Sequence, residues 1–104
     1  MRKASVFMHD KLAGYLTEIE KGKKYQFTYE SEYDGPPISL TMPAERKTYE
    51  FDSFPPFFDG LLPEGFQLEG LLRKQKIDRD DLFSQIVIVG KDLVGAISVE
   101  ERNE

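Results

Sequence analysis

The 104 residues carry a formal net charge of −5 and no cysteine, which excludes disulfides, thiolate metal sites and cysteine nucleophiles and fits a reducing compartment. The length suits one domain over residues 1–104. The sequence shows no secretion signal and no apolar run near the ~20 residues of a membrane span, so we expect a cytoplasmic protein without membrane contact. Acidic residues follow each basic cluster closely, so the uninterrupted basic stripe that direct nucleic-acid binding requires is missing.

The first half of the chain has the period-two alternation of antiparallel strands that bury one face. Five short strands are predicted there, over residues 4–8, 15–19, 25–29, 38–42 and 49–51. His9-Asp10-Lys11 and Lys21-Gly22 are predicted turns between the first three strands. Pro43 is predicted to end the fourth strand, because proline cannot donate a hydrogen bond to a ladder.

Past Asp52 the apolar residues recur at helical spacing. A short helix is predicted around Phe57, Phe58, Leu61 and Leu62. A second helix is predicted over residues 63–75, because Pro63 is tolerated in the first turn of a helix. Its predicted buried stripe consists of Leu68, Leu71 and Leu72.

A third helix has the clearest start signal in the sequence. Asp78 is predicted as its N-cap, with Asp81 at the third helical position as a capping partner. Ile77 and Leu82 then occupy the hydrophobic-staple positions. The predicted buried stripe consists of Leu82, Phe83, Ile86 and Val87. Gly90 is predicted to end this helix.

The C-terminal segment returns to a strand pattern over residues 93–99, and residues 100–104 are predicted to be a frayed tail. Strands followed by helices and a closing strand predict an α+β fold. We expect an antiparallel β-sheet of about five to six short strands with about three helices packed on one side.

Residues for enzymatic chemistry are few. His9 is the only histidine and falls in a predicted turn, so we expect a solvated residue there, and one imidazole cannot build a metal site. Asp59 and Glu64 are candidates for the acid/base pair of a hydrolase, although carboxylates are common near turns and helix starts. The aspartates at 78–81 lack EF-hand spacing, and Gly90 and Gly95 lack the Lys-Ser/Thr of a phosphate-binding loop. We therefore expect a non-enzyme without catalytic residues, cofactor or metal.

The segment over residues 54–66 combines six large apolar residues with three prolines and two glycines. Phe66 stands out because it lies about 160–200° from Leu68 around the helix, away from the predicted buried stripe. Two interpretations stay open. Phe66 either caps the core at the start of its helix, or remains exposed as an aromatic anchor for a partner.

Four ordered motifs resemble the N-terminal subdomain 1 of HipA-type kinases: Leu40-Thr41-Met42-Pro43, Phe57-Phe58-Asp59-Gly60-Leu61-Leu62-Pro63-Glu64-Gly65, Asp81-Leu82-Phe83 and Val89-Gly90-Lys91-Asp92-Leu93-Val94-Gly95-Ala96. The resemblance covers nearly the whole chain. Nothing in the sequence resembles the glycine-rich loop or the catalytic and magnesium-binding residues of the kinase core. Phosphoryl transfer by this chain alone is therefore not expected.

Separated from a kinase, the subdomain is similar to the HipS proteins of three-gene HipB–HipS–HipT toxin–antitoxin modules. The resemblance implies a HipA-like serine/threonine kinase toxin (HipT-like) as partner. That kinase would halt growth by phosphorylating an aminoacyl-tRNA synthetase, and the small protein would neutralise it. A helix-turn-helix protein (HipB-like) would bind the DNA.

On this resemblance we expect a kinase-binding surface at Asp59, Leu62, Pro63, Glu64, Gly65, Phe66 and Gln67. Phe66 would act there as a wedge against lobe closure, and Glu64 would pair with a basic group. Two other roles stay open. The protein would either complete the kinase fold as a structural or activating subunit, or act as a small acidic hydrolase through Asp59 or Glu64.

Overall fold

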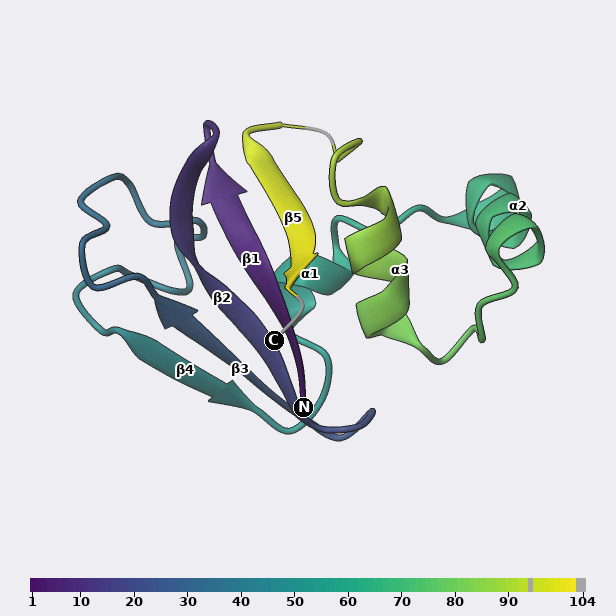
Figure 1. The fold of residues 1–104 in the computed structure, drawn as a ribbon, viewed down its shortest axis with the longest axis horizontal. Helices are drawn as coiled ribbons and strands as arrows, with labels where there is room; N and C mark the ends of the chain where they lie inside the picture. The colour runs from purple at the N-terminus through teal and green to yellow at the C-terminus, as the bar shows by residue number, and fades with distance from the viewer. Residues whose placement is uncertain (94, 103–104) are drawn as a thin grey trace.

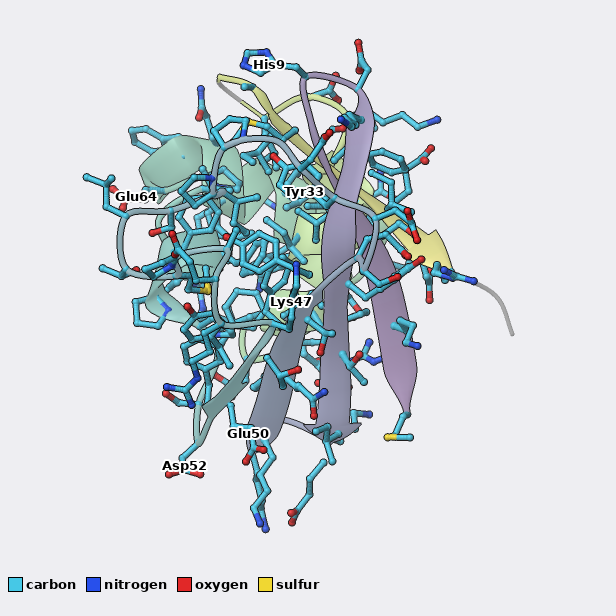
Figure 2. The ribbon with its side chains drawn as sticks, turned by 90° about the vertical axis from the view of Figure 1, so that its left-hand side faces the viewer. His9, Tyr33, Lys47, Glu50, Asp52 and Glu64 are labelled. Atoms are coloured by element: carbon cyan, nitrogen blue, oxygen red, sulfur yellow. The ribbon has the colours of Figure 1, made fainter. Side chains whose placement is uncertain are left out.

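A computed structural model describes residues 1–93 and 95–102 and shows a five-stranded antiparallel sheet with three helices on one side (Figures 1 and 2). The strands are β1 (Arg2–Met8), β2 (Lys11–Glu20), β3 (Lys24–Tyr29), β4 (Thr48–Phe51) and β5 (Ile97–Arg102). The helices are α1 (Pro56–Asp59), α2 (Gly65–Gln75) and α3 (Leu82–Val89). The strand order β4-β3-β2-β1-β5 pairs the last strand with the first. The predicted α+β fold is confirmed.

Local turn chemistry explains the first hairpin. His9 and Asp10 have φ angles of 50° and 64°, so both adopt the left-handed conformation that a two-residue turn between twisted strands requires. The predicted turn and the strands on either side of it are confirmed, as are those around residues 25–29 and 49–51.

The strand predicted over residues 38–42 is wrong. The segment is a tight turn in which the Met42 N–H donates to the Ser39 carbonyl (3.1 Å), and Leu40 stands 94% exposed at its tip. Ile38 and Met42 are buried, as the alternation indicated. The Tyr29 hydroxyl accepts from the Ile38 N–H and donates to the Met42 carbonyl, so this backbone needs no neighbouring strand.

The core lies between the sheet and the helices α1 and α3. Its largest fully buried side chains are Val6, Leu16, Phe27, Phe58, Phe83, Ile86 and Val99, together with Gln85 and Pro55. The Phe27 and Phe58 rings, from β3 and α1, have centroids 5.9 Å apart. These contacts hold α1 flat against the sheet and so position the chain that leaves it.

Helix α2 extends away from the sheet and the other two helices (Figure 1). It begins at Gly65, two residues after the predicted start, because the chain is still extended at Glu64. Leu72 is its only buried residue, whereas Leu68 and Leu71 of the predicted stripe are half-buried. The prediction of Leu71 as a core residue is therefore wrong.

Helix α3 begins later than predicted. Asp81, not Asp78, is the N-cap, and its carboxylate accepts from the Ser84 N–H (3.1 Å). The staple predicted for Ile77 and Leu82 is wrong for the same reason, since Leu82 is the first helical residue. The predicted stripe is confirmed at Phe83 and Ile86, which are fully buried.

Gly90 ends α3, as predicted, but its φ of −57° is open to any residue. Space is the reason for glycine: a Cβ there would lie 1.8 Å from the Val99 carbonyl oxygen of β5. We expect Gly90→Ala to lower the free energy of unfolding by about 1–3 kcal/mol, because α3 must move off β5. Gly70→Ala is the matched control, since a Cβ at that α2 position meets nothing within 4 Å.

Urea unfolding monitored by circular dichroism measures both variants. Alanine at Gly70 is expected to stabilise α2 slightly, by up to about 1 kcal/mol, because it is the better helix former. Equal stabilities for the two variants would contradict the close approach of α3 to β5.

The closing strand begins and ends later than predicted. β5 starts at Ile97, and residues 100–102 pair with β1 rather than fraying. The remainder of the predicted tail, residues 103–104, and position 94 of the predicted strand lie outside the described residues.

Candidate functional site

The chain from the end of α1 into the first turn of α2, residues 60–67, makes a sharp bend that we call the elbow. After α1, the Leu62 N–H donates to the Asp59 carbonyl (3.1 Å), which closes a turn. Gly65 has a φ of +60°, the left-handed conformation that glycine adopts without strain. No Cβ clash would arise there, so backbone conformation alone explains glycine at this position. The bend directs α2 away from the sheet.

Phe66 follows this bend in the first turn of α2, and its side chain is 97% exposed. It therefore does not cap the core, and of the two open interpretations the structure leaves the exposed one. Full burial of such a side chain would contribute about 1.5–3 kcal/mol, which the isolated protein forgoes.

A depression of about 340 Å³, the elbow hollow, is lined in part by Gln67, the residue after Phe66 in α2. The rest of its lining consists of residues 60–63 of the elbow, Val89 at the end of α3, and Asp92 and Leu93 in the segment after α3. The side chains of Leu61, Val89 and Leu93 are half-buried, so the hollow has an apolar lining that water reaches. Elements distant in sequence, the elbow and the end of α3, thus form one hollow.

Helix α3, one wall of the elbow hollow, is tied to the sheet by Arg2. The Arg2 guanidinium donates from Nε to Glu18 Oε1 (2.7 Å), from Nη2 to Asp81 Oδ1 (2.9 Å) and from Nη1 to Ser84 Oγ (2.8 Å). It also lies over the Phe83 ring, 4.8 Å from the centroid. One side chain of β1 therefore connects β2 to the start of α3.

The Arg2 contacts set the protonation of both carboxylates. Burial raises the pKa of Glu18, but hydrogen bonds from Arg2, the Gly22 N–H and Tyr25 outweigh it, so this pKa lies below its ordinary value. Burial also raises the pKa of Asp81, but hydrogen bonds from Arg2 and Ser84 outweigh it, so this pKa too lies below its ordinary value. Burial beside Glu18 also raises the pKa of Tyr25 to about 12.

Comparison with known proteins identifies the family. Residues 4–100 match the model of the HipA N-terminal domain. The chain belongs to that family. An uncharacterized protein of Haemophilus influenzae is 31% identical over 104 residues, covering 100% of this chain and 96% of that relative. Among solved structures, the N-terminal domain of a HipA toxin is similar with a TM-score of 0.78 and 28% identity, covering 100% of this chain and 95% of that one.

Three of the seven expected binding residues of this HipA N-terminal domain, Leu62, Pro63 and Gln67, line the elbow hollow. Phe66, next to Gln67 in α2, is exposed. The motif from Val89 to Ala96 formed part of the family resemblance, yet nothing in the sequence placed Asp92 or Leu93 against the elbow. Their contribution to this surface follows only from the fold.

Asp59 and Glu64, the candidates for the acid/base pair of a hydrolase, are both exposed. Within residues 1–93 and 95–102 neither side chain takes part in a hydrogen bond or an ion pair. Nothing in their surroundings distinguishes them from ordinary surface carboxylates. Figure 2 shows Glu64 at the outer edge of the helical side, well away from His9.

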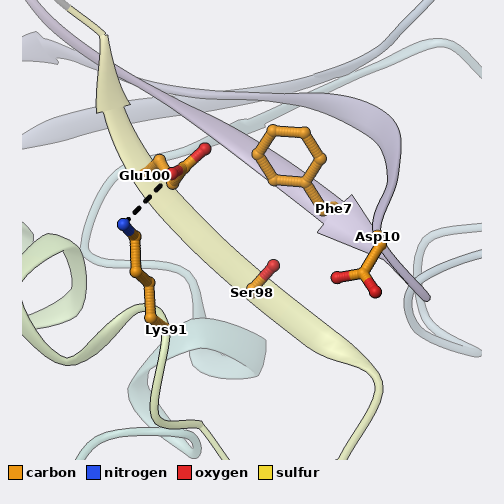
Figure 3. Close-up of a pocket in the computed structure, with 5 residues that line it drawn as sticks. All are labelled: Phe7, Asp10, Lys91, Ser98 and Glu100. Carbon is orange, nitrogen blue, oxygen red and sulfur yellow. Dashed lines mark ion pairs between the residues drawn. The ribbon is translucent and has the colours of Figure 1, made fainter.

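Other depressions lie elsewhere on the HipA N-terminal domain, and two of them differ from the elbow hollow in their lining. One lies beside β5 and contains Asp10, Ser98 and the exposed ion pair of Lys91 with Glu100, 3.7 Å apart (Figure 3). The other, of about 250 Å³, is an apolar hollow beside β4, lined in part by Tyr49 and Phe57. Neither is lined by a residue of the elbow or by His9.

The described residues offer few sites for other chemistry. His9 stands exposed at the tip of the β1–β2 hairpin (Figure 2). Across the described part of the chain, no three His, Cys, Asp or Glu side chains come together as a metal ion would require. In that same part, every helix is too short or too polar to cross a bilayer.

Proposed function

We propose that this protein docks on a separately encoded HipA-like serine/threonine kinase toxin and neutralises it. Membership of the HipA N-terminal domain family supports a role connected with such toxins. The observation that carries the proposal is Phe66, which is almost fully exposed directly after the glycine bend. Aromatic anchors dominate interface energetics, so Phe66 supports a partner that buries it.

The proposed mechanism places the elbow in the cleft between the lobes of the kinase. Phe66 acts there as a wedge against lobe closure, and Glu64 pairs with a basic group of the kinase. The rest of the contact consists of Asp59, Leu62, Pro63, Gly65 and Gln67. Inhibition requires tighter binding to the open kinase than to the closed one, since equal affinity for both would shift nothing.

Phe66→Ala tests this mechanism. We expect the affinity for the kinase to fall by about 2 kcal/mol, or ~30-fold, because a central aromatic anchor is lost. The free energy of unfolding should stay within about 0.5 kcal/mol of the parent, because the side chain makes no core contact. Isothermal calorimetry and urea unfolding measure the two quantities.

Leu40→Ala is the matched control, because Leu40 is also an apolar side chain left almost fully exposed, at the tip of a turn. The loop that carries it joins β3 to β4, at the opposite end of the molecule from α2 (Figure 1). We expect unchanged affinity. If Phe66→Ala binds and silences the kinase like the parent, Phe66 is not a wedge.

Co-expression with the kinase separates inhibition from the alternative role. The extension of α2 away from the sheet suits an alternative in which the protein completes the kinase fold as a structural or activating subunit. Restored growth with a stable complex supports the antitoxin. A complex with unrelieved or worsened growth arrest supports the alternative, and the absence of a complex contradicts both.

The proposal places the protein in the cytoplasm, acting by binding and without a cofactor. A HipB-like helix-turn-helix protein is the proposed DNA-binding partner of the complex. The net charge of −5 supports this division of labour, since DNA binding depends on neutralising phosphates with basic side chains.

A further inference from the structure

Among residues 1–93 and 95–102, no side chain fills the elbow hollow. Phe66 is 97% exposed and so does not fold into it, although its neighbour Gln67 lies on the lining. Phe66 and Gln67 are neighbours in α2, with side chains about 100° apart around the helix axis, so a partner wide enough to contact both side chains would reach the hollow. The half-buried lining from Leu61, Val89 and Leu93 offers that partner an apolar contact in addition to Phe66.

The surroundings of the hollow are acidic. Asp92 lines it, and Asp59 and Glu64 precede and follow the elbow residues that form its wall. All three side chains are exposed, and within the described ranges none of them forms an ion pair. Lys91, next to Asp92 in sequence, points to Glu100 at the β5 edge instead (Figure 3).

We infer that the elbow hollow receives an adjacent pair of kinase side chains, one apolar and one basic. The apolar side chain fills the hollow against Leu61, Val89 and Leu93. The basic side chain lies on the acidic rim, near Asp92. This inference rests on the proposed function and adds a second anchor to Phe66, one supplied by the kinase.

The physical basis is that of a binding hot spot. An apolar side chain gains most where its site is already partly desolvated, and the hollow provides such a site. An uncompensated acidic rim favours a basic neighbour and disfavours an acidic one, which adds specificity and speeds association. The two terms together select a particular segment of the kinase.

Two single variants test the two halves of the inference. Gln67→Trp fills the hollow from an exposed α2 position, and Asp92→Lys reverses the charge on its rim. The matched control is Glu32→Lys, the same charge change at an exposed position in the β3–β4 loop. Each protein is titrated into the purified kinase, and its fold is checked by thermal unfolding.

Each hollow variant is expected to bind the kinase about tenfold more weakly, while Glu32→Lys binds like the parent. The loss for Asp92→Lys should shrink at high salt, because exposed charges are screened. Parental affinity for Gln67→Trp would overturn the apolar half of the inference. Parental affinity for Asp92→Lys would overturn the basic half.

Failure of this inference is distinguishable from failure of the proposed function. If the parent protein does not bind the kinase, the proposed function fails first. If the parent binds and Phe66→Ala weakens binding while both hollow variants do not, only the inference fails. Analytical sedimentation of the free protein tests whether a second copy of this chain occupies the hollow instead. If the parent is a dimer and Gln67→Trp is a monomer, a second copy fills the hollow, and the inference is overturned.

Discussion

Arg2→Met is expected to lower the free energy of unfolding by roughly 3–5 kcal/mol at neutral pH, because it leaves a buried carboxylate without its partner. Glu18 is only 4% exposed and accepts from Arg2 Nε at 2.7 Å. Asp81 loses a 2.9 Å partner at the same time. Methionine keeps most of the apolar stem, so the change reports mainly on the charge.

The loss should depend on pH. Glu18 and Asp81 have pKa values below their ordinary range in the folded protein, so their contribution is present above the unfolded pKa, about 4. It disappears as the pH falls through the folded pKa values. The difference between the parent and Arg2→Met should therefore be largest at pH 7 and shrink below pH ~4.

Urea unfolding at pH 7, 5, 4 and 3 measures this difference, with Lys23→Met as a matched control at an exposed turn position. The control should change stability by less than about 0.5 kcal/mol. A difference for Arg2→Met that stays constant down to pH 3 would show that the guanidinium ties α3 to the sheet through Ser84 and Phe83 rather than through the two carboxylates.

Phe58→Ala is expected to cost about 3–5 kcal/mol of folding stability, as complete truncation of a buried aromatic does. Phe58 is fully buried and packs between the Phe27 and Phe57 rings, with centroids 5.9 and 5.1 Å away. Because the elbow directly follows α1, the free energy of unfolding also measures how strongly α1 and the start of the elbow are fixed to the sheet.

Phe57→Ala is the matched control, since Phe57 neighbours Phe58 on α1 but is half-buried. Its truncation should cost less, about 1–2 kcal/mol, because part of the ring already contacts water. Chemical denaturation of both variants gives the comparison. Equal costs would mean that α1 packs through both rings rather than through Phe58.

The expected binding surface came from a family resemblance on contiguous motifs, and the structure extended it. Leu62, Pro63 and Gln67 lie where one short segment bends, so their proximity needed no tertiary information. Val89 and Leu93 join them only because α3 packs back beside the elbow. The exposure of Phe66 was one of two open interpretations, and only the packing around α2 decided between them.

What the sequence determined by itself was local: the alternation of β1, β2 and β3, the glycine-containing turns, and the order of strands and helices. These depend on neighbouring residues, whose preferences act within one element. The tertiary structure decided the places where a side chain from a distant strand bonds to a segment. Arg2 binds Asp81, and α3 begins there rather than after Asp78. The Tyr29 hydroxyl hydrogen-bonds to the backbone of Ile38 and Met42, and that segment is a turn instead of the predicted strand. In both places one side chain from a distant strand satisfies polar groups that a local pattern assigns to a regular element.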